Sequence, residues 1–181
     1  MDKRFLVEQL TDRLREVAVG ARRAGAAAEE EARVGATASE KRENARVSQE
    51  YSSLARGQKE RAARALAEAA ALEAFRPIAL PARAAIALGA IVEVEVEVEV
   101  DSDAEATRRP TAEPGRVQGR TFVLAPAGAG IELTGPGGDG FLSVVTPQSP
   151  VGRSVLGRRV GDTIEVTVEG EPREWTITFV G

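Results

Sequence analysis

The residues that could do chemistry in this chain are mainly carboxylates and basic groups, because it contains no histidine and no cysteine. The usual general base of neutral-pH hydrolases, the commonest zinc ligand and all thiolate chemistry are therefore excluded. Polar side chains gather in one short segment, Ala36-Thr37-Ala38-Ser39-Glu40-Lys41-Arg42-Glu43-Asn44-Ala45, between two alanine-rich stretches. Because it interrupts two helical patterns, we expect this segment to reach a partner.

Two long segments with helical spacing flank the polar decapeptide. From Leu6 to Val34 the apolar residues recur at steps of three or four, at Leu6, Leu10, Leu14, Val17, Ala21, Ala24 and Ala28. From Glu43 to Phe75 the stripe continues with Val47, Tyr51, Leu54, Leu66, Leu72 and Phe75. The pattern predicts an antiparallel coiled-coil hairpin over residues 1–76, with its tip near residues 36–45. At about 1.5 Å per residue, it should project about 45 Å.

Composition limits the possible partners. The chain has 181 residues, 24 basic and 28 acidic, and a net charge of -4. Proteins that bind nucleic acid by bulk charge are usually clearly basic, so this balance argues against that class, although not against a partner that holds nucleic acid. The N-terminus lacks the apolar block of a signal peptide, and no apolar run is long enough to span a membrane. We expect a cytoplasmic protein.

The composition changes after Phe75, where all nine prolines and most glycines lie. Arg76-Pro77 should end the helix, and residues 77–88 are predicted to be a linker to a second domain at 89–181. Residues 91–100 alternate strictly between apolar and acidic side chains, which is typical of a half-buried strand. The glutamates are then either a solvated outer face, which we favour, or an acidic strip that binds cations or a basic partner.

The rest of the second domain is predicted to be a small, mostly antiparallel sheet with one short helix. Residues 101–119 are predicted to be a loop, followed by strands at 120–126, 131–133 and 141–145. The glycine-rich residues 135–140 read as a turn, since they lack the lysine and hydroxyl spacing of a nucleotide loop. Ser149-Pro150 should begin a short helix that Gly157 ends. Residues 163–168 and 175–180 are expected to form a hairpin, with Trp175 in the core. The fold class is therefore α+β.

This order of parts resembles the Gre family of bacterial transcription elongation factors, the transcript-cleavage factors. The segment Glu40-Lys41-Arg42-Glu43-Asn44-Ala45 is similar to the family's tip motif, and Leu88-Gly89-Ala90-Ile91-Val92 resembles the entry into its globular domain. The most specific match is Thr146-Pro147-Gln148-Ser149-Pro150-Val151-Gly152-Arg153-Ser154-Val155-Leu156-Gly157, with Gly161-Asp162 after it. The resemblance implies an FKBP-like C-terminal domain.

The resemblance also implies a mode of action. In that family the hairpin enters the secondary channel of RNA polymerase, and the polymerase's own active site then hydrolyses backtracked RNA. Glu40 and Glu43 would help to hold a Mg²⁺ ion shared with the polymerase, while Asn44 would order the turn. Magnesium often takes only one or two protein carboxylates, and a second ion can activate water. Lys41, Arg42 and Arg46 would approach RNA phosphates, and Ser149, Pro150 and Arg153 would contact the polymerase. The chain would be a monomer that stimulates the RNA cleavage activity of the polymerase. It would have no enzymatic activity of its own and no tightly bound cofactor.

Several alternatives stay open. Glu40 stands where the family commonly has aspartate, so a Gre-like regulator or inhibitor that occupies the channel without promoting cleavage is the main one. Glu40 and Glu43 could also be ordinary charges at a helix start, where the helix dipole favours acidic residues. A peptide-binding or prolyl-isomerase-like module is suggested only by the implied fold, and the few aromatic residues argue against it. A coiled-coil dimerisation protein is a further possibility.

Overall fold

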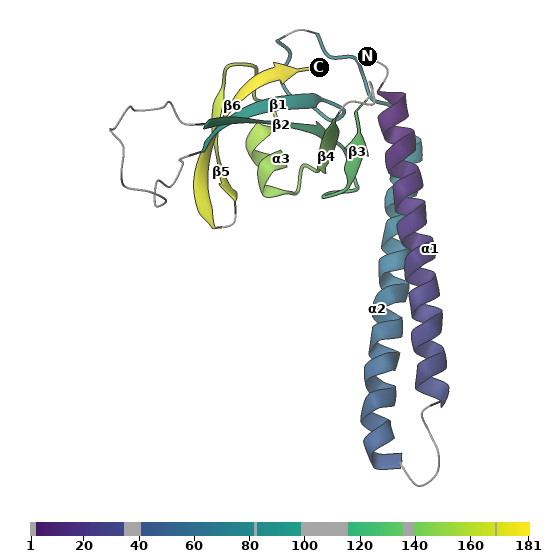
Figure 1. The fold of residues 1–181 in the computed structure, drawn as a ribbon. Coiled ribbons are helices and arrows are strands. Elements are labelled where there is room, and N and C mark those ends of the chain that lie inside the picture. The colour runs from purple at the N-terminus through teal and green to yellow at the C-terminus, as the bar shows by residue number, and fades with distance from the viewer. Residues whose placement is uncertain (1–2, 35–40, 82, 99–115, 136–139, 169) are drawn as a thin grey trace, which may run out of the picture. The chain divides into compact units, whose positions relative to one another are not determined.

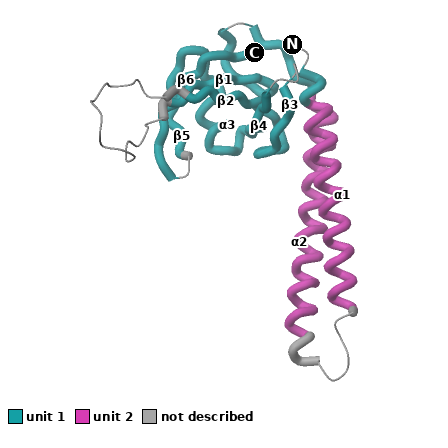
Figure 2. Tube along the Cα trace, in the orientation of Figure 1, with its two compact units in different colours: residues 1–6, 76–181 teal, residues 7–75 magenta. Residues whose placement is uncertain are grey.

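A computed structural model of the chain describes residues 3–34, 41–81, 83–98, 116–135, 140–168 and 170–181 (Figure 1). The chain divides into two compact units (Figure 2). One comprises the described parts of residues 1–6 and 76–181, and the other comprises those of residues 7–75. Within the described residues, no helix combines the length and the apolar character that crossing a membrane requires.

Two long helices form the second unit. Helix α1 is Arg4–Val34 and α2 is Lys41–Ala74. Three contacts between the helices show their relative direction. Arg15 pairs with Glu73, Lys59 pairs with Glu29, and Ser48 Oγ donates to the carbonyl of Ala32. Since residue numbers rise on one helix as they fall on the other, the helices are antiparallel, which confirms the predicted hairpin.

The first half of the helical interface follows the predicted stripe with two exceptions. Val17 is half-buried and Ala24 is exposed, while Ala18 is only 1% exposed and Gly25 is buried. A Cβ on Gly25 would lie 3.4 Å from Cβ of Gln58, so the helix backbones approach closely there. The buried stripe therefore continues in the regular steps of three and four that keep one face towards a partner.

The second half of the interface differs from the prediction more strongly. The larger apolar residues Val47, Leu54 and Leu66 are 44%, 51% and 36% exposed. The buried positions on α2 are instead small ones at coiled-coil spacing, followed by one leucine: Ala55, Ala62, Ala65, Ala69 and Leu72. Alanine side chains let two helices pack at the short end of the usual separation, and the bulkier Val47, Leu54 and Leu66 lie outside this interface.

The C-terminal unit is built on one six-stranded sheet with the order β3-β4-β2-β1-β6-β5. Its strands are β1 (Ile91–Val98), β2 (Arg116–Leu124), β3 (Glu132–Thr134), β4 (Phe141–Val145), β5 (Thr163–Val168) and β6 (Glu171–Val180). The predicted α+β class is confirmed. One pair, β2 with β4, is parallel, so the sheet is mixed rather than wholly antiparallel.

Strand β1 shows the alternation that the sequence predicts. Val92, Val94 and Val96 are at most 1% exposed, whereas Glu93 and Glu95 are exposed. The glutamates therefore form a solvated outer face. Strand β2 begins at Arg116, inside the predicted loop 101–119, because Arg116 to Gly119 pair with the second half of β1. Residues 101–115 lie outside the described residues.

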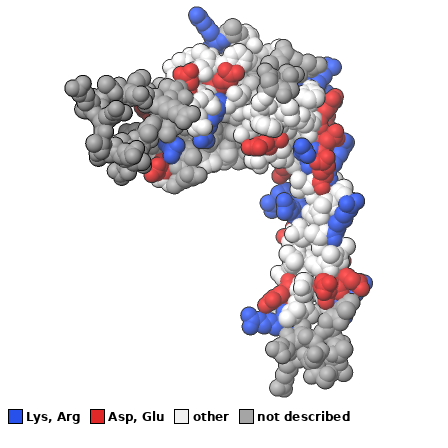
Figure 3. Space-filling model, viewed as in Figure 1, with Lys and Arg blue, Asp and Glu red and all other residues white. Residues whose placement is uncertain are grey.

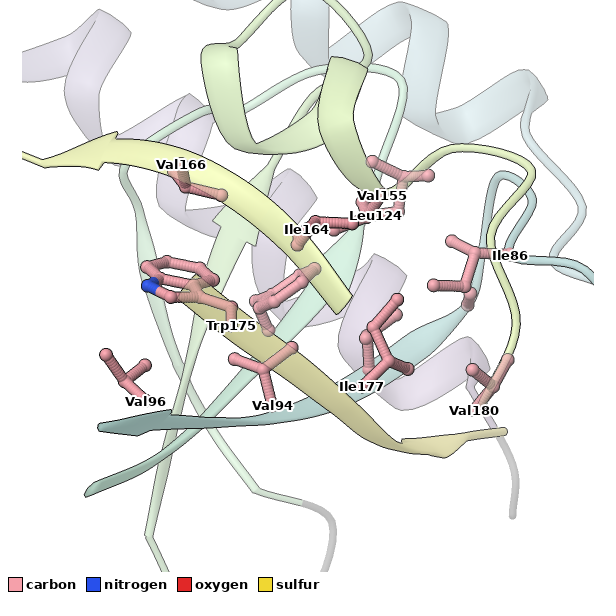
Figure 4. Close-up of a cluster of buried hydrophobic side chains, with 13 residues drawn as sticks. Ile86, Val94, Val96, Leu124, Val155, Ile164, Val166, Trp175, Ile177 and Val180 are labelled. Atoms are coloured by element: carbon pink, nitrogen blue, oxygen red, sulfur yellow. The ribbon is translucent and has the colours of Figure 1, made fainter. Parts of the chain in front are cut away.

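The core lies on the valine face of the sheet. Val94, Trp175 and Ile177 pack there with Val155 of the short helix α3 (Pro150–Val155) (Figure 4). Ile86, from the segment predicted as a linker, is 2% exposed in the same cluster. Its amide donates to the carbonyl of Arg158 and its carbonyl accepts from Gly157, which joins this segment to the turn after α3.

The start of the chain is also fixed within this unit. Lys3 is 7% exposed, and its Nζ donates to the carbonyl of Ile78 at 3.0 Å. Burial lowers the pKa of this ammonium group below its ordinary value, because the charged form loses hydration.

Candidate functional site

The chain reverses between the end of α1 at Val34 and the start of α2 at Lys41. Residues 35–40 lie outside the described part of the chain, and Glu40 is among them. Lys41, Arg42, Glu43 and Asn44 form the first turn of α2, so this helix starts earlier than the predicted Glu43. The structure describes the backbone of this turn and not its four side chains.

A carboxylate in the first turn of a helix has two possible roles. The unpaired backbone N–H groups and the helix dipole stabilise negative charge there, whatever else the residue does. Glu43 meets this description through its backbone position alone. Its position is therefore compatible both with an ordinary helix start and with a metal ligand.

Arg46, predicted to approach RNA, lies one turn further along α2. Its Nε is 3.2 Å from Oε1 of Glu50, and both side chains are largely exposed. Exposed ion pairs at this spacing contribute about 0.3–0.5 kcal/mol. Such a pair would exchange readily for a phosphate. Figure 3 shows charged side chains of both signs along the visible face of the two helices.

The described side chains do not form a metal site of their own. Within the described ranges, no group of three or more aspartate, glutamate, histidine or cysteine residues could hold an ion. The side chains of the predicted pair, Glu40 and Glu43, lie outside the described part of the chain. The donor chemistry of the pair suits Mg²⁺, which prefers carboxylate oxygens and completes its shell with water and phosphate. Two carboxylates are too few ligands to hold such an ion, so a partner would have to supply further ligands.

The predicted partner-binding residues lie around the start of α3. Ser149 is the N-cap, since its Oγ accepts from the amide of Gly152 at 3.0 Å and donates to the carbonyl of Thr146 at 2.8 Å. Pro150 is the first helical residue and is exposed. Arg153 is also exposed, and its guanidinium donates to the carbonyl of Gln148 at 2.6 Å. The structure thus brings these three residues together around one helix start.

Gly152 is a structural residue that the sequence reading missed. A Cβ at this position would lie 1.9 Å from the carbonyl oxygen of Thr146 and 2.7 Å from its carbon. Both atoms belong to the backbone, so neither can move without moving the turn. Only glycine therefore fits at position 152, where α3 lies against the turn at residues 146–149. The sequence feature that could have indicated this close contact is a glycine inside a short predicted helix, three residues after its cap.

Comparison with known proteins bears on the C-terminal unit. Residues 135–181 match the family model "Transcription elongation factor, GreA/GreB, C-term", and this segment contains β4, α3, β5 and β6. This match confirms the predicted resemblance to the Gre family for residues 135–181. The matched segment includes the predicted Ser-Pro helix start and the Gly161-Asp162 turn. Asp162 Oδ2 accepts from the amide of Arg159 and so closes that turn.

Solved structures were compared as well. "Crystal structure of GreA factor homolog 1 (Gfh1) protein of Thermus thermophilus" is 19% identical, with 97% of this chain and 94% of that chain covered and a TM-score of 0.38. "Crystal structure of Thermus aquaticus Gfh1" is 19% identical, with 96% and 92% covered and a TM-score of 0.37. A comparison with curated proteins found no match.

Proposed function

We propose that this chain is an RNA polymerase-binding elongation factor whose hairpin enters the secondary channel and stimulates Mg²⁺-dependent cleavage of backtracked RNA. The observation that carries the proposal is the match of residues 135–181 to the GreA/GreB C-terminal family, in a chain that also forms a long helical hairpin. The chain would not itself be an enzyme, because the bond would be hydrolysed in the active site of the polymerase.

The length and slenderness of the hairpin support this proposal. Helix α1 has 31 residues, which at about 1.5 Å per residue spans about 46 Å. The alanine-lined interface keeps the two helices close, at a separation near the lower end of about 8–10 Å. The resulting rod is slender enough to suit a narrow channel. At one end of the rod the chain reverses between α1 and α2. Glu40 precedes the first residue of α2, and Glu43 lies in the first turn of that helix.

The carboxylates of Glu40 and Glu43 would act as oxygen ligands delivered to a catalytic centre that the polymerase supplies. A magnesium ion held there would neutralise charge that develops on phosphate and favour the deprotonation of water. Asn44 would keep the turn in place by hydrogen bonding. Lys41, Arg42 and Arg46 would bind RNA phosphates, with Arg46 leaving its exposed pair with Glu50 to do so.

The polymerase contact is proposed for Ser149, Pro150 and Arg153. Pro150 and Arg153 are exposed at the start of α3, and the Ser149 cap fixes the backbone that presents them. A rigid turn with a prolyl ring and a guanidinium can bind a partner with little loss of conformational entropy. We expect one chain to bind one polymerase as a monomer.

A cleavage assay on stalled elongation complexes tests the proposal. The wild-type chain should accelerate RNA cleavage above polymerase alone, and Glu40→Ala or Glu43→Ala should each reduce that stimulation at least about tenfold, as the loss of groups around a metal typically does. Glu60→Ala is the matched control, because Glu60 is an exposed glutamate in the middle of α2. The proposal is wrong if wild type gives no stimulation while it still co-purifies with polymerase.

That outcome would instead support the alternative, a channel-binding regulator without cleavage activity. Its specific support is Glu40, whose carboxylate is one methylene further from the backbone than the aspartate common in the family. Glu40→Asp distinguishes the two functions. If the chain is a regulator without cleavage activity because of Glu40, Glu40→Asp should give it cleavage activity. If it is a cleavage factor, Glu40→Asp should alter the stimulation of cleavage less than Glu40→Ala does.

A further inference from the structure

The indole nitrogen of Trp175 is an unused hydrogen-bond donor inside the C-terminal core. The side chain is 4% exposed, and its Nε1 has no hydrogen-bond partner. Buried N–H groups without an acceptor are rare in folded proteins, because they lose hydration without compensation. In Figure 4 this nitrogen points towards the end of the cluster where Val96 and Val166 lie, away from Ile86 and Val180.

The strand pairing places further donors on the same face at the same end. Arg120 pairs with Val94 and Gln118 pairs with Val96, and both valines are buried on the core face. Directly opposite residues in a sheet point to the same side, so Arg120 and Gln118 also lie on this face. The guanidinium carbon of Arg120 lies 5.7 Å from the centre of the Trp175 ring.

A second guanidinium lies beside them on β6. Arg173 is two residues before Trp175 and pairs with Val166, so it shares the core face. Its side chain is 30% exposed and lies 3.5 Å from Glu171, whose own side chain is 75% exposed. We call Gln118, Arg120, Arg173 and Trp175 the donor end of the core face. Apart from the amide oxygen of Gln118, these four side chains offer only N–H donors.

We propose that the donor end binds a carboxylate side chain from an acidic segment of a partner protein. Donors need an acceptor, and two guanidinium groups favour one that is negatively charged. The indole ring is only 4% exposed, so a nucleic acid base finds no open ring face to stack on, whereas a carboxylate needs to reach a single N–H group. One carboxylate oxygen would accept from Arg120, whose exposed side chain would swing off the ring. The other would accept from the indole N–H, which is buried until that movement uncovers it.

The single tryptophan of the chain makes the proposal directly testable. In the ¹⁵N-labelled full chain it gives one indole N–H cross-peak. A capped peptide of alternating alanine and glutamate, at millimolar concentration and constant ionic strength, should move this peak downfield and saturate. The same peptide with glutamine in place of glutamate, and inorganic phosphate, should leave it in place. An unmoved peak with the glutamate peptide overturns the proposal, and an equal shift with phosphate overturns the choice of a protein carboxylate.

Two variants separate a binding role from a structural one. Arg120→Gln should lower the affinity for the glutamate peptide about tenfold, the change expected when one charge-assisted hydrogen bond is lost. Arg158→Gln is the control, since Arg158 is an exposed arginine in the turn after α3. Trp175→Phe keeps the ring and removes the donor, and calorimetry should show weaker peptide binding with the backbone spectrum retained. Equal affinities for wild type and Arg120→Gln contradict the assignment.

Discussion

Replacing Gly152 by alanine should destabilise the C-terminal unit severely. The added Cβ would sit 1.9 Å from the carbonyl oxygen of Thr146 and 2.7 Å from its carbon, far inside contact distance. The same turn carries the Ser149 cap, whose 3.0 Å bond to the amide of Gly152 would stretch as the backbone separates. Overpacking costs about 1–3 kcal/mol and a lost cap about 1 kcal/mol, so we expect the free energy of unfolding to fall by about 3 kcal/mol.

Urea denaturation followed by Trp175 fluorescence measures this effect, because the only tryptophan lies in the core of this unit. With a denaturant slope of about 1.5 kcal/mol/M, the midpoint should fall by about 2 M. Gly119→Ala is the control, since a Cβ on Gly119 in β2 meets nothing within 4 Å. Equal midpoints for Gly152→Ala and Gly119→Ala would refute the reasoning from the close approach.

Two further predictions concern the hairpin. Gly20→Ala and Gly57→Ala should each raise the free energy of unfolding of the hairpin by up to about 1 kcal/mol, because alanine is the better helix former and a Cβ there meets nothing within 4 Å. Thermal melting followed by helical circular dichroism measures the change, and unchanged melting of both variants would contradict this prediction. The hydrogen bond and charge of Lys59 lower the pKa of Glu29 below its ordinary value of 4.5, so this pair stabilises the hairpin above that pH and the contribution is lost as the pH falls through the lowered pKa. Lys59→Gln should therefore flatten the pH dependence of hairpin melting below pH 4.5, and a dependence identical to wild type would count against the pair.

The sequence predicted elements whose pattern is local. Regular apolar spacing predicted both helices, and strict alternation predicted β1 with its valines buried and its glutamates in solvent. The cap chemistry of Ser149 and Pro150 predicted the start of α3, and Gly157, with a φ of 81°, ends it in the left-handed conformation. In each case the determining interactions lie within one turn or one strand of the residues that signal them.

Features that depend on distant partners could not be predicted. The face of α2 that packs on α1 carries the alanines, so these are buried and Leu54 and Leu66 are not. The parallel pairing of β2 with β4, and the packing of Ile86 into the core, join segments far apart in the sequence. The tight contact between Gly152 and Thr146 depends on the path of the turn. The roles of Glu40, Glu43 and Asn44 stay predictions.

The magnesium dependence of RNA cleavage tests the central claim most directly, because the claim is that the carboxylates of Glu40 and Glu43 help to hold the ion. The measurement is the Mg²⁺ concentration that gives half-maximal cleavage in stalled elongation complexes. Wild-type chain should lower this concentration about tenfold relative to polymerase alone, the effect of about one added charged ligand group. Glu43→Gln, which keeps the size and removes the charge, should raise it from the wild-type value towards that of polymerase alone, because one of the two carboxylates is lost. Equal Mg²⁺ dependence for wild type and Glu43→Gln would contradict the account.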